Sequence, residues 1–288
     1  MRTDEPQLRA AYAECTAIAK AHYENFPVGS LLVPKRIRPH FHAIYAFMRS
    51  ADDFADLPHR PKEDRLRLLA DWRRSFAEVS SGNIPTNPIF IALQDTVRKF
   101  DLPQGLLTAL LDAFDFDANG DVKFETYEEL HWYTRRSAEP VGQLVLALFG
   151  YQDAERIAWS NDICTALQII NFMQDAGEDL ANDRCYFPRE DYLKYGIHSA
   201  AEIVTSTRAG DLVLFECQRI KQLLENGKRL PKSVHGRLKF ELRGVLQGAW
   251  AMVRKIEEAR GDTISNRPKL TSSERRAILW RALLPSGD

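Results

Sequence analysis

The sequence lacks a hydrophobic segment long enough to cross a membrane, because no apolar run approaches the roughly 18–20 residues that a spanning helix requires. Its first residues show no basic flank followed by a short apolar core, so we expect no secretory signal. Only four cysteines occur among 288 residues, and they form no CxxC pair. No HExxH motif or Cys/His cluster indicates zinc. These absences predict a cytoplasmic protein with free thiols.

A charge excess of either sign is also lacking, since 39 basic residues balance 40 acidic ones. Proteins that coat nucleic acids usually carry a basic excess, so we expect no nucleic-acid partner. A mean hydropathy of −0.35 with 44% hydrophobic residues indicates a globular chain. Balance over the whole chain still allows acidic residues to be concentrated at one place.

Helices are predicted along nearly the whole chain. Apolar residues recur at three- and four-residue spacings, whereas the alternation typical of strands is almost absent. Proline, glycine and capping patterns place the helices at about 39–57, 61–81, 87–100, 104–116, 126–149, 153–181, 210–227, 231–260 and from 271 onward. Residues 182–209 form the longest segment predicted to be irregular. No linker or repeat divides the chain, so we predict one all-α domain over 1–288.

The first of these helices carries an acidic stripe. Tyr45, Arg49, Asp52 and Asp56 are spaced by 4, 3 and 4 residues. This spacing places them within about 60° of one another around a helix axis. Asp53 lies about a quarter-turn away by the same geometry.

A second acidic stripe is predicted in the helix at 153–181. Gln168, Asn171, Asp175 and Asp179 fall within roughly 80° of arc. Each stripe therefore holds two carboxylates at i, i+4, where like charges weaken a helix by a few tenths of a kcal/mol, roughly. We expect a compensating partner for each pair.

Mg²⁺ is one candidate partner, because it is usually held by one or two carboxylates together with substrate phosphates. Two such helices facing each other would form a Mg²⁺–diphosphate clamp at the mouth of a helix bundle. The alternative for a single stripe is a solvated face with scattered ion pairs. Two stripes, each with an amide, tyrosine or arginine on the same face, favour the clamp.

Several motifs, in order, resemble the squalene/phytoene synthase family. They are Asp52, Asp53 and Asp56 after AIYAFMR, the segment Tyr133–Gly142, the pattern QxxNxxxDxxxD from Gln168 to Asp179, and NDRCYFP from Asn182 to Pro188. The resemblance runs from His22 to about Lys269. It implies an all-α isoprenoid-synthase helix bundle with a central apolar cavity, in which three Mg²⁺ ions bridge the aspartates and a diphosphate.

The resemblance also implies roles for single residues. The expected metal ligands are Asp52, Asp56, Asp175 and Asp179, with Asn171 and Gln168 as auxiliary polar contacts. Arg49 and Arg184 are expected to bind phosphate oxygens, since arginine suits bidentate phosphate contact. The other expected substrate contacts are Tyr45, Tyr133, Tyr186 and Phe26. Aromatic side chains available to face a carbocation are Phe26, Tyr45, Phe47, Phe172 and Trp250.

Within the family, the sequence is most similar to the bacterial hydroxysqualene synthase branch of the hopanoid pathway. ENFPVGSLLVP, YTRRSAEPVG, INFMQDAGEDL and RPKL carry this likeness. Arg136 and Gln174 stand where squalene and dehydrosqualene synthases have tyrosine and arginine, and both changes suit that branch. The expected reaction is ionisation of presqualene diphosphate, carbocation rearrangement and capture by water, with no NADPH. Arg136 is expected to hold the diphosphate, position the water, or pair with Glu139.

Three alternatives remain open from the residues. One is head-to-head condensation of two farnesyl diphosphates to presqualene diphosphate, squalene or a C30 carotenoid precursor; another is a non-catalytic helical binding protein. The third is a Ca²⁺-binding loop. The pattern Asp115-x-Asp117-x-Asn119-Gly120 matches half of an EF-hand loop, but Thr126 stands where the glutamate is needed.

The expected partners are pathway enzymes and, at most, a membrane surface. The pathway enzymes are a presqualene diphosphate synthase and a flavin-dependent reductase. The basic terminal helix is expected to dock onto its own chain, with at most peripheral contact with the inner membrane.

Overall fold

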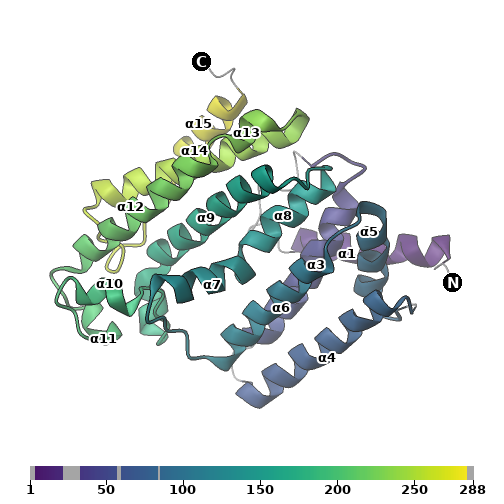
Figure 1. Cartoon of the computed structure of the whole chain (residues 1–288), viewed down its shortest axis with the longest axis horizontal. Coiled ribbons are helices and arrows are strands. Elements are labelled where there is room, and N and C mark those ends of the chain that lie inside the picture. Colours follow the sequence, from purple (N-terminus) through teal and green to yellow (C-terminus); the bar gives the residue numbers. More distant parts are fainter. Residues whose placement is uncertain (1–3, 22–32, 57–59, 84, 284–288) are drawn as a thin grey trace. The chain divides into compact units, whose positions relative to one another are not determined.

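The computed structural model describes residues 4–21, 33–56, 60–83 and 85–283, and within them every regular element is an α-helix (Figure 1). The all-α class predicted from the sequence is therefore confirmed. The helices are α1 (Glu5–Ala21), α3 (Arg38–Ala55), α4 (Lys62–Ser81), α5 (Pro88–Phe100), α6 (Gln104–Asn119), α7 (Tyr127–Ser137), α8 (Glu139–Leu148), α9 (Ala154–Ala181), α10 (Arg189–Leu193), α11 (Ala200–Ile203), α12 (Ala209–Gly227), α13 (Leu230–Ser233), α14 (Gly236–Glu258) and α15 (Ser272–Leu283).

The chain forms two compact units. Unit 1 consists of Met1–Gly120 and Pro140–Asp153, and unit 2 consists of Asp121–Glu139 and Ala154–Asp288. Among the described helices, none combines the length and the apolarity that a bilayer span needs.

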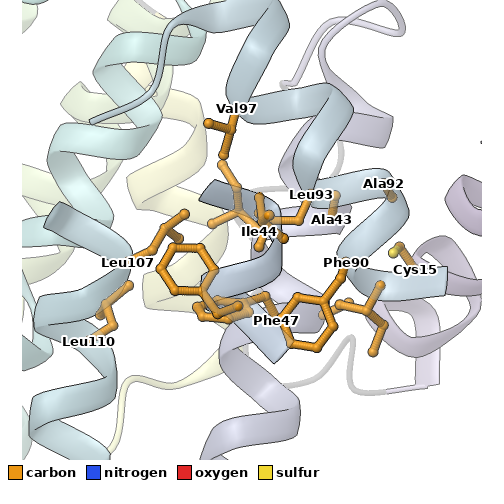
Figure 2. Packing of buried hydrophobic residues seen from close by; sticks show 14 of the residues in the cluster. Cys15, Ala43, Ile44, Phe47, Phe90, Ala92, Leu93, Val97, Leu107 and Leu110 are labelled. Atoms are coloured by element: carbon orange, nitrogen blue, oxygen red, sulfur yellow. The ribbon is translucent and has the colours of Figure 1, made fainter. Parts of the chain in front are cut away.

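In unit 1, α3 lies at the centre and packs against α1, α4, α5 and α6. Its Phe47 side chain has 0% of its surface exposed. The Phe47 ring contacts those of Trp72, Phe76 and Phe90 at centroid distances of 6.0, 5.3 and 6.0 Å. Figure 2 shows Phe47 among the apolar side chains of this core, with Phe90 close by. One face of α3 is thereby fixed, which sets the direction of its polar face.

In unit 2, the 28-residue helix α9 packs against α12, α7, α13 and α14. The crossing with α12 is close at Gly227, where an added Cβ would lie 2.4 Å from Cγ1 of Ile163 and 2.9 Å from the Trp159 carbonyl oxygen. Glycine is therefore needed for the two helices to approach this closely.

Two predicted helices are interrupted in the structure. The helix predicted over 126–149 breaks at Ala138, two residues before Pro140, which has no N–H to donate to the preceding turn. The helix predicted over 231–260 divides at Val234 and His235, whose backbones are extended. The Thr126 cap is confirmed, since its hydroxyl accepts from the Glu129 N–H at 3.3 Å.

Other segments also differ from the sequence expectation. The segment 182–209 contains the short helices α10 and α11, and α1 precedes the first helix that the sequence predicts. Asp115 and Asp117 lie inside α6, which ends at Gly120 with a φ of 78°. A helical backbone cannot supply the loop of an EF-hand, so this pattern is an ordinary helix end.

Replacing Phe47 by alanine tests the packing that orients α3. We expect Phe47→Ala to lower the free energy of unfolding by about 3–5 kcal/mol, because a fully buried aromatic ring is removed. Urea denaturation followed by circular dichroism measures this change. The exposed Val204 serves as the control, since Val204→Ala should change stability by less than about 0.5 kcal/mol. Equal stabilities of the two variants would contradict the assignment of Phe47 to the core.

Candidate active site

The first acidic stripe lies at the C-terminal end of α3 in unit 1. Tyr45, Arg49 and Asp52 lie on one face of the helix, and Asp56 is its C-cap, with its N–H donating to the Asp52 carbonyl at 2.9 Å. The Arg49 guanidinium bonds Asp52 at 3.1 Å and also bonds Asp53. Arg49 therefore partly neutralises this end of the helix.

An apolar cleft of about 20 Å³ adjoins this stripe within unit 1. Tyr45 belongs to both features, because it lines the cleft one turn before Arg49. Burial raises the pKa of the Tyr45 hydroxyl, so this group stays neutral. The remaining lining residues are Phe41, Ile44 and Met48 of α3 and Val141, Leu144, Val145 and Leu148 of α8. The α3 surface thus changes from apolar to acidic within two turns.

The second acidic stripe lies on α9 in unit 2, with Gln168, Asn171, Asp175 and Asp179 in regular helix. Burial, followed by repulsion from Asp175, raises the pKa of Asp179 from 3.8 to about 6. The positive charges of Arg184 and Arg267 act in the opposite direction. This carboxylate pair is therefore incompletely compensated by the protein.

Arg267 is a site residue that the sequence reasoning did not identify. Its Nε forms an ion pair with Oδ1 of Asp175, which stands 92 positions earlier in the chain. Next to it, the Gln174 amide donates to the Pro268 carbonyl at 3.0 Å. The RPKL motif contained the signal, although no role could be assigned to it from the residues alone.

Gly177 allows the segment that carries Arg267 to cross α9. A Cβ at this position would lie 2.2 Å from the Ile264 carbonyl oxygen, far inside contact distance. The absence of a side chain at Gly177 therefore lets this segment run close along α9 on the side away from the aspartates, and the Arg267 side chain reaches Asp175 from there. The motif QDAGEDL thus combines two carboxylates with the glycine at which the arginine-bearing segment crosses the helix.

The NDRCYFP segment brings two further predicted residues to unit 2's stripe. The Arg184 N–H donates to the Asp179 carbonyl at 2.9 Å, and the Cys185 N–H donates to the Val122 carbonyl at 2.9 Å. These bonds fix the segment between the end of α9 and the irregular residues before α7. Tyr186 is thereby held against α9.

A group of stacked aromatic rings lies beside the α9 stripe. The rings of Phe172 and Tyr186 are 3.8 Å apart and nearly parallel, at 6°. Tyr133 of α7 lies 6.2 Å from Phe172 and 6.1 Å from Tyr186. Phe172 shares the face of α9 that carries the aspartates, by the helical spacing of residues 168–179. Unit 2 therefore has aromatic ring faces beside its acidic stripe.

Arg136 lies one turn beyond Tyr133 on α7. Its guanidinium carbon is 4.0 Å from the centre of the Trp132 ring, and Nη1 donates to the Trp132 carbonyl at 3.1 Å. The buried Glu139 carboxylate accepts from the Thr165 hydroxyl at 3.0 Å and lies 3.2 Å from His131 Nε2. Glu139 thus contacts Thr165 and His131. An ion pair with Glu139 was one of the three roles expected for Arg136.

The aromatic residues expected to face a carbocation lie in different parts of the structure. Phe47 belongs to the core of unit 1, so the expectation that it is available is wrong. Trp250 lines a groove between α14 and α15, and Phe26 falls outside the described residues. Tyr45 and Phe172 each lie beside an acidic stripe.

The residues present fit a Mg²⁺ ion that takes some of its ligands from protein carboxylates and the others from a phosphate group. In the described ranges, no three histidine, cysteine, aspartate or glutamate side chains converge to form an all-protein metal cage. Each unit instead offers a pair of aspartates one turn apart. One or two carboxylates plus phosphate oxygens is the usual way in which proteins hold Mg²⁺.

The chain matches one known protein family over most of its length. The family model for squalene/phytoene synthase matches residues 19–275. Hydroxysqualene synthase from Zymomonas mobilis is 35% identical over 216 residues, which are 73% of this chain and 67% of that protein. Presqualene diphosphate synthase from Rhodopseudomonas palustris is 32% identical over 173 residues, which are 60% of this chain and 61% of that protein.

Solved structures show the same fold. Squalene synthase HpnC from Alicyclobacillus acidocaldarius is 34% identical, with a TM-score of 0.82 over 89% of this chain and 97% of that one. A dehydrosqualene synthase solved with a ligand has a TM-score of 0.83 at 21% identity, over 96% of each chain. The predicted all-α isoprenoid-synthase fold is therefore confirmed.

Replacing Gly177 by alanine separates helix propensity from steric fit. In an open helical position this change stabilises a protein by roughly 0.5–1 kcal/mol. We expect Gly177→Ala to lower the melting temperature instead, because its Cβ would clash with the Ile264 carbonyl. Gly248→Ala is the matched control in α14, since nothing lies within 4 Å of its added Cβ. A Gly177→Ala protein as stable as the control variant would contradict the close crossing.

The raised pKa of Asp179 predicts a pH-dependent effect of Asp179→Asn on stability. A folded-state pKa of about 6, above the ordinary 3.8, means that the folded protein favours the protonated carboxyl. The contribution of Asp179 to wild-type stability therefore decreases as the pH rises from about 4 to 7, whereas the neutral amide avoids this loss. We expect the melting temperature of Asp179→Asn to exceed that of the wild type at pH 8, with the gap closing towards pH 4. A difference in melting temperature that stays the same at every pH would contradict the raised pKa of Asp179.

Proposed function

The chain belongs to the squalene/phytoene synthase family, and on this basis we propose that it converts presqualene diphosphate to hydroxysqualene with Mg²⁺. The family assignment makes it an enzyme that processes isoprenoid diphosphates. The similarity to hydroxysqualene synthase from Zymomonas mobilis and to squalene synthase HpnC supports the finer choice of reaction.

The observation that supports this proposal most directly is the neighbourhood of anionic and aromatic groups in unit 2. Asp175 and Asp179 stand on the same face of α9 as Phe172, whose ring stacks on Tyr186. Ionisation of an allylic or cyclopropylcarbinyl diphosphate creates an anionic leaving group and a carbocation close together. The α9 face offers groups suited to each product.

The reaction breaks the carbon–oxygen bond of presqualene diphosphate, and diphosphate leaves with the electron pair. The cyclopropylcarbinyl cation then rearranges with opening of the ring, and the oxygen of one water molecule bonds to the resulting allylic cation. Loss of a proton from that water gives hydroxysqualene, so no hydride donor is consumed. Aromatic faces such as those of Phe172 and Tyr186 attract a cation by about 0.5–2 kcal/mol, which favours charge at this position.

The aspartates of each unit are the proposed Mg²⁺ ligands. Asp52 and Asp56 would hold the metal in unit 1, and Asp175 and Asp179 would hold it in unit 2, with Asn171 and Gln168 as auxiliary polar contacts. Bound Mg²⁺ supplies Lewis-acid stabilisation of the departing diphosphate.

The arginines are the proposed diphosphate contacts of the protein itself. Arg49, Arg184 and Arg267 all lie next to these carboxylates, and a guanidinium can bind two phosphate oxygens at once. Arg267 now pairs with Asp175, so phosphate binding would exchange one anionic partner for another. Tyr45 and Tyr133 are the proposed contacts for the apolar part of the substrate.

Two substitutions relative to the squalene and dehydrosqualene synthase pattern support the water-quenched reaction. Gln174 donates to the Pro268 carbonyl, so it supports the Arg267 segment but contributes no charge to the diphosphate. Arg136 places a cation over the exposed Trp132 ring, where that pattern has a tyrosine. We assign Arg136 a role in holding the diphosphate or positioning the water.

The second candidate reaction is the condensation of two farnesyl diphosphates. Two presqualene diphosphate synthases, from Rhodopseudomonas palustris and Zymomonas mobilis, are 32% and 31% identical to this chain and favour it. In the preferred reaction such a synthase would supply the substrate, and a reductase would consume the alcohol.

Product analysis separates these possibilities. Purified protein is given presqualene diphosphate or farnesyl diphosphate with Mg²⁺, with and without NADPH, and the lipids are identified by mass spectrometry. We expect hydroxysqualene from presqualene diphosphate at the same rate with or without NADPH. Turnover of farnesyl diphosphate alone would instead support condensation. Squalene formed from presqualene diphosphate only with NADPH would refute capture of the cation by water. No turnover of either substrate would support a non-catalytic binding protein.

Removal of one carboxylate from each stripe tests the metal-ligand proposal. We expect Asp52→Asn and Asp175→Asn each to reduce Mg²⁺-dependent diphosphate release by about 100-fold or more, because stabilisation of the leaving group is lost. Asp71→Asn, on the exposed side of α4, is the matched control and should retain activity. Full activity in either stripe variant would refute the metal-ligand role of that residue.

A further inference from the structure

The segment Asn182–Pro188 and the short helix α10 after it are bound to the residues at the start of α7. The Arg189 N–H donates to the Phe124 carbonyl at 2.8 Å. The Tyr127 N–H, in the first turn of α7, donates to Oε1 of Glu190 in α10 at 2.7 Å. Hydrogen bonds therefore join two parts of unit 2 that lie far apart in the sequence.

Arg219 of α12 contacts both of these parts. Its Nη2 donates to Oδ2 of Asp191 in α10 at 3.1 Å. Its guanidinium carbon lies 3.9 Å from the centre of the Tyr127 ring in α7. Its Nη1 donates to Oε2 of Glu216, one turn earlier in α12. One guanidinium thus connects α12 to α10 and to α7.

The carboxylates that bind Arg219 are fully buried. Asp191 and Glu216 each have 0% of their surfaces exposed, and Lys194 also bonds Asp191, at 2.8 Å. Burial raises the pKa of Glu216, and the charge of Asp191 acts in the same direction, whereas Arg219 opposes both. Removal of this cation would leave buried carboxylates uncompensated, so the guanidinium is held in one geometry.

The two parts that Arg219 joins carry two rings of the stacked aromatic group. Tyr133 stands within two turns of the start of α7, and Tyr186 stands just before α10. Both rings pack with that of Phe172 in α9. Helix α12 itself packs on α9. Arg219 therefore ties the segments that carry the two tyrosines to a helix that packs on α9.

We propose that Arg219 is a positioning residue that holds Tyr133 and Tyr186 in place against α9 and thereby selects the carbon atom at which water captures the cation. This inference rests on the proposed function. Aromatic faces attract positive charge, so the positions of these rings influence where the charge lies and which side of the cation stays open to water. Arg219 acts through the segments that it joins and does not contact the reacting atoms.

The alcohol products report this selection. Capture of the cyclopropylcarbinyl cation, or of either end of the allylic cation, forms one carbon–oxygen bond to water and releases one proton. All of these products are therefore isomeric alcohols, and hydroxysqualene is one of them. A displaced ring would change the shares of the isomers without any change in the co-reactants.

Chromatography and mass spectrometry of the alcohols formed from presqualene diphosphate with Mg²⁺ test the proposal. R219Q alone would leave two buried carboxylates without their cation, so the double variant R219Q/E216Q removes one charge of each sign. We expect this variant to raise the ratio of other alcohols to hydroxysqualene about tenfold or more, since misplacing a group by about 1 Å can change a rate by about 100-fold. R219K, which keeps the charge, should give a ratio between those of the double variant and the wild type.

The matched control is K221Q/E257Q, assayed at a temperature at which circular dichroism shows every variant folded. Lys221 Nζ and Glu257 Oε1 form an ion pair at 2.7 Å between α12 and α14. The control thus also removes an ion pair of α12, but neither of its residues belongs to α7 or α10. We expect its alcohol ratio to stay within about twofold of the wild-type ratio, as for a change away from the site. An equal shift in both double variants would assign the effect to general loosening of α12 and would overturn the proposal.

Hydroxyl-radical footprinting of the substrate-free protein separates this proposal from the proposed reaction. Tyr133 and Tyr186 are buried in the wild type. We expect R219Q/E216Q to increase their modification about fivefold or more, because local opening exposes side chains, and K221Q/E257Q to leave it unchanged. Failure of the wild type to turn over presqualene diphosphate would refute the proposed function, while the footprint would still decide the positioning role. Wild-type protection of both tyrosines in folded R219Q/E216Q would overturn the proposal, as would a wild-type alcohol ratio.

Discussion

The repulsion between two carboxylates one turn apart on α9 is the interaction around which this part of unit 2 is built. Burial and the charge of Asp175 raise the pKa of Asp179 to about 6, so the fold bears a cost to keep both acids on one face. Two devices reduce that cost. Gly177 admits the segment that carries Arg267 to Asp175, and the positive charge of Arg184 acts on the Asp179 carboxylate.

The same face would allow one helix to serve both products of the proposed ionisation. An anion needs cations and metal-binding oxygens, whereas a carbocation needs aromatic faces and little water. The helical repeat brings Phe172 into line with Asp175 and Asp179, and the stacked Tyr186 extends this aromatic surface. In unit 1, α3 shows a comparable change from an apolar cleft at Tyr45 to acidic groups at Asp52 and Asp56.

Periodicity predicted the helices and both acidic faces, because those depend on residues within a few turns of each other. It did not predict the break before Pro140, where an apolar pattern continues through a backbone interruption. Nor did it separate Phe47, which packs in a core, from Phe172, since both lie on apolar-rich helices. Arg267 was missed because its partner lies 92 positions away, a distance that no local pattern spans.

The central claim is that the carbon–oxygen bond of the substrate breaks and water captures the cation. Turnover of presqualene diphosphate in water enriched with ¹⁸O tests this directly, by mass spectrometry of the alcohol. Ionisation followed by water capture predicts one ¹⁸O atom in the hydroxyl group of hydroxysqualene. An unlabelled alcohol would show that the phosphorus–oxygen bond breaks instead, as in simple phosphate-ester hydrolysis, and would contradict the account.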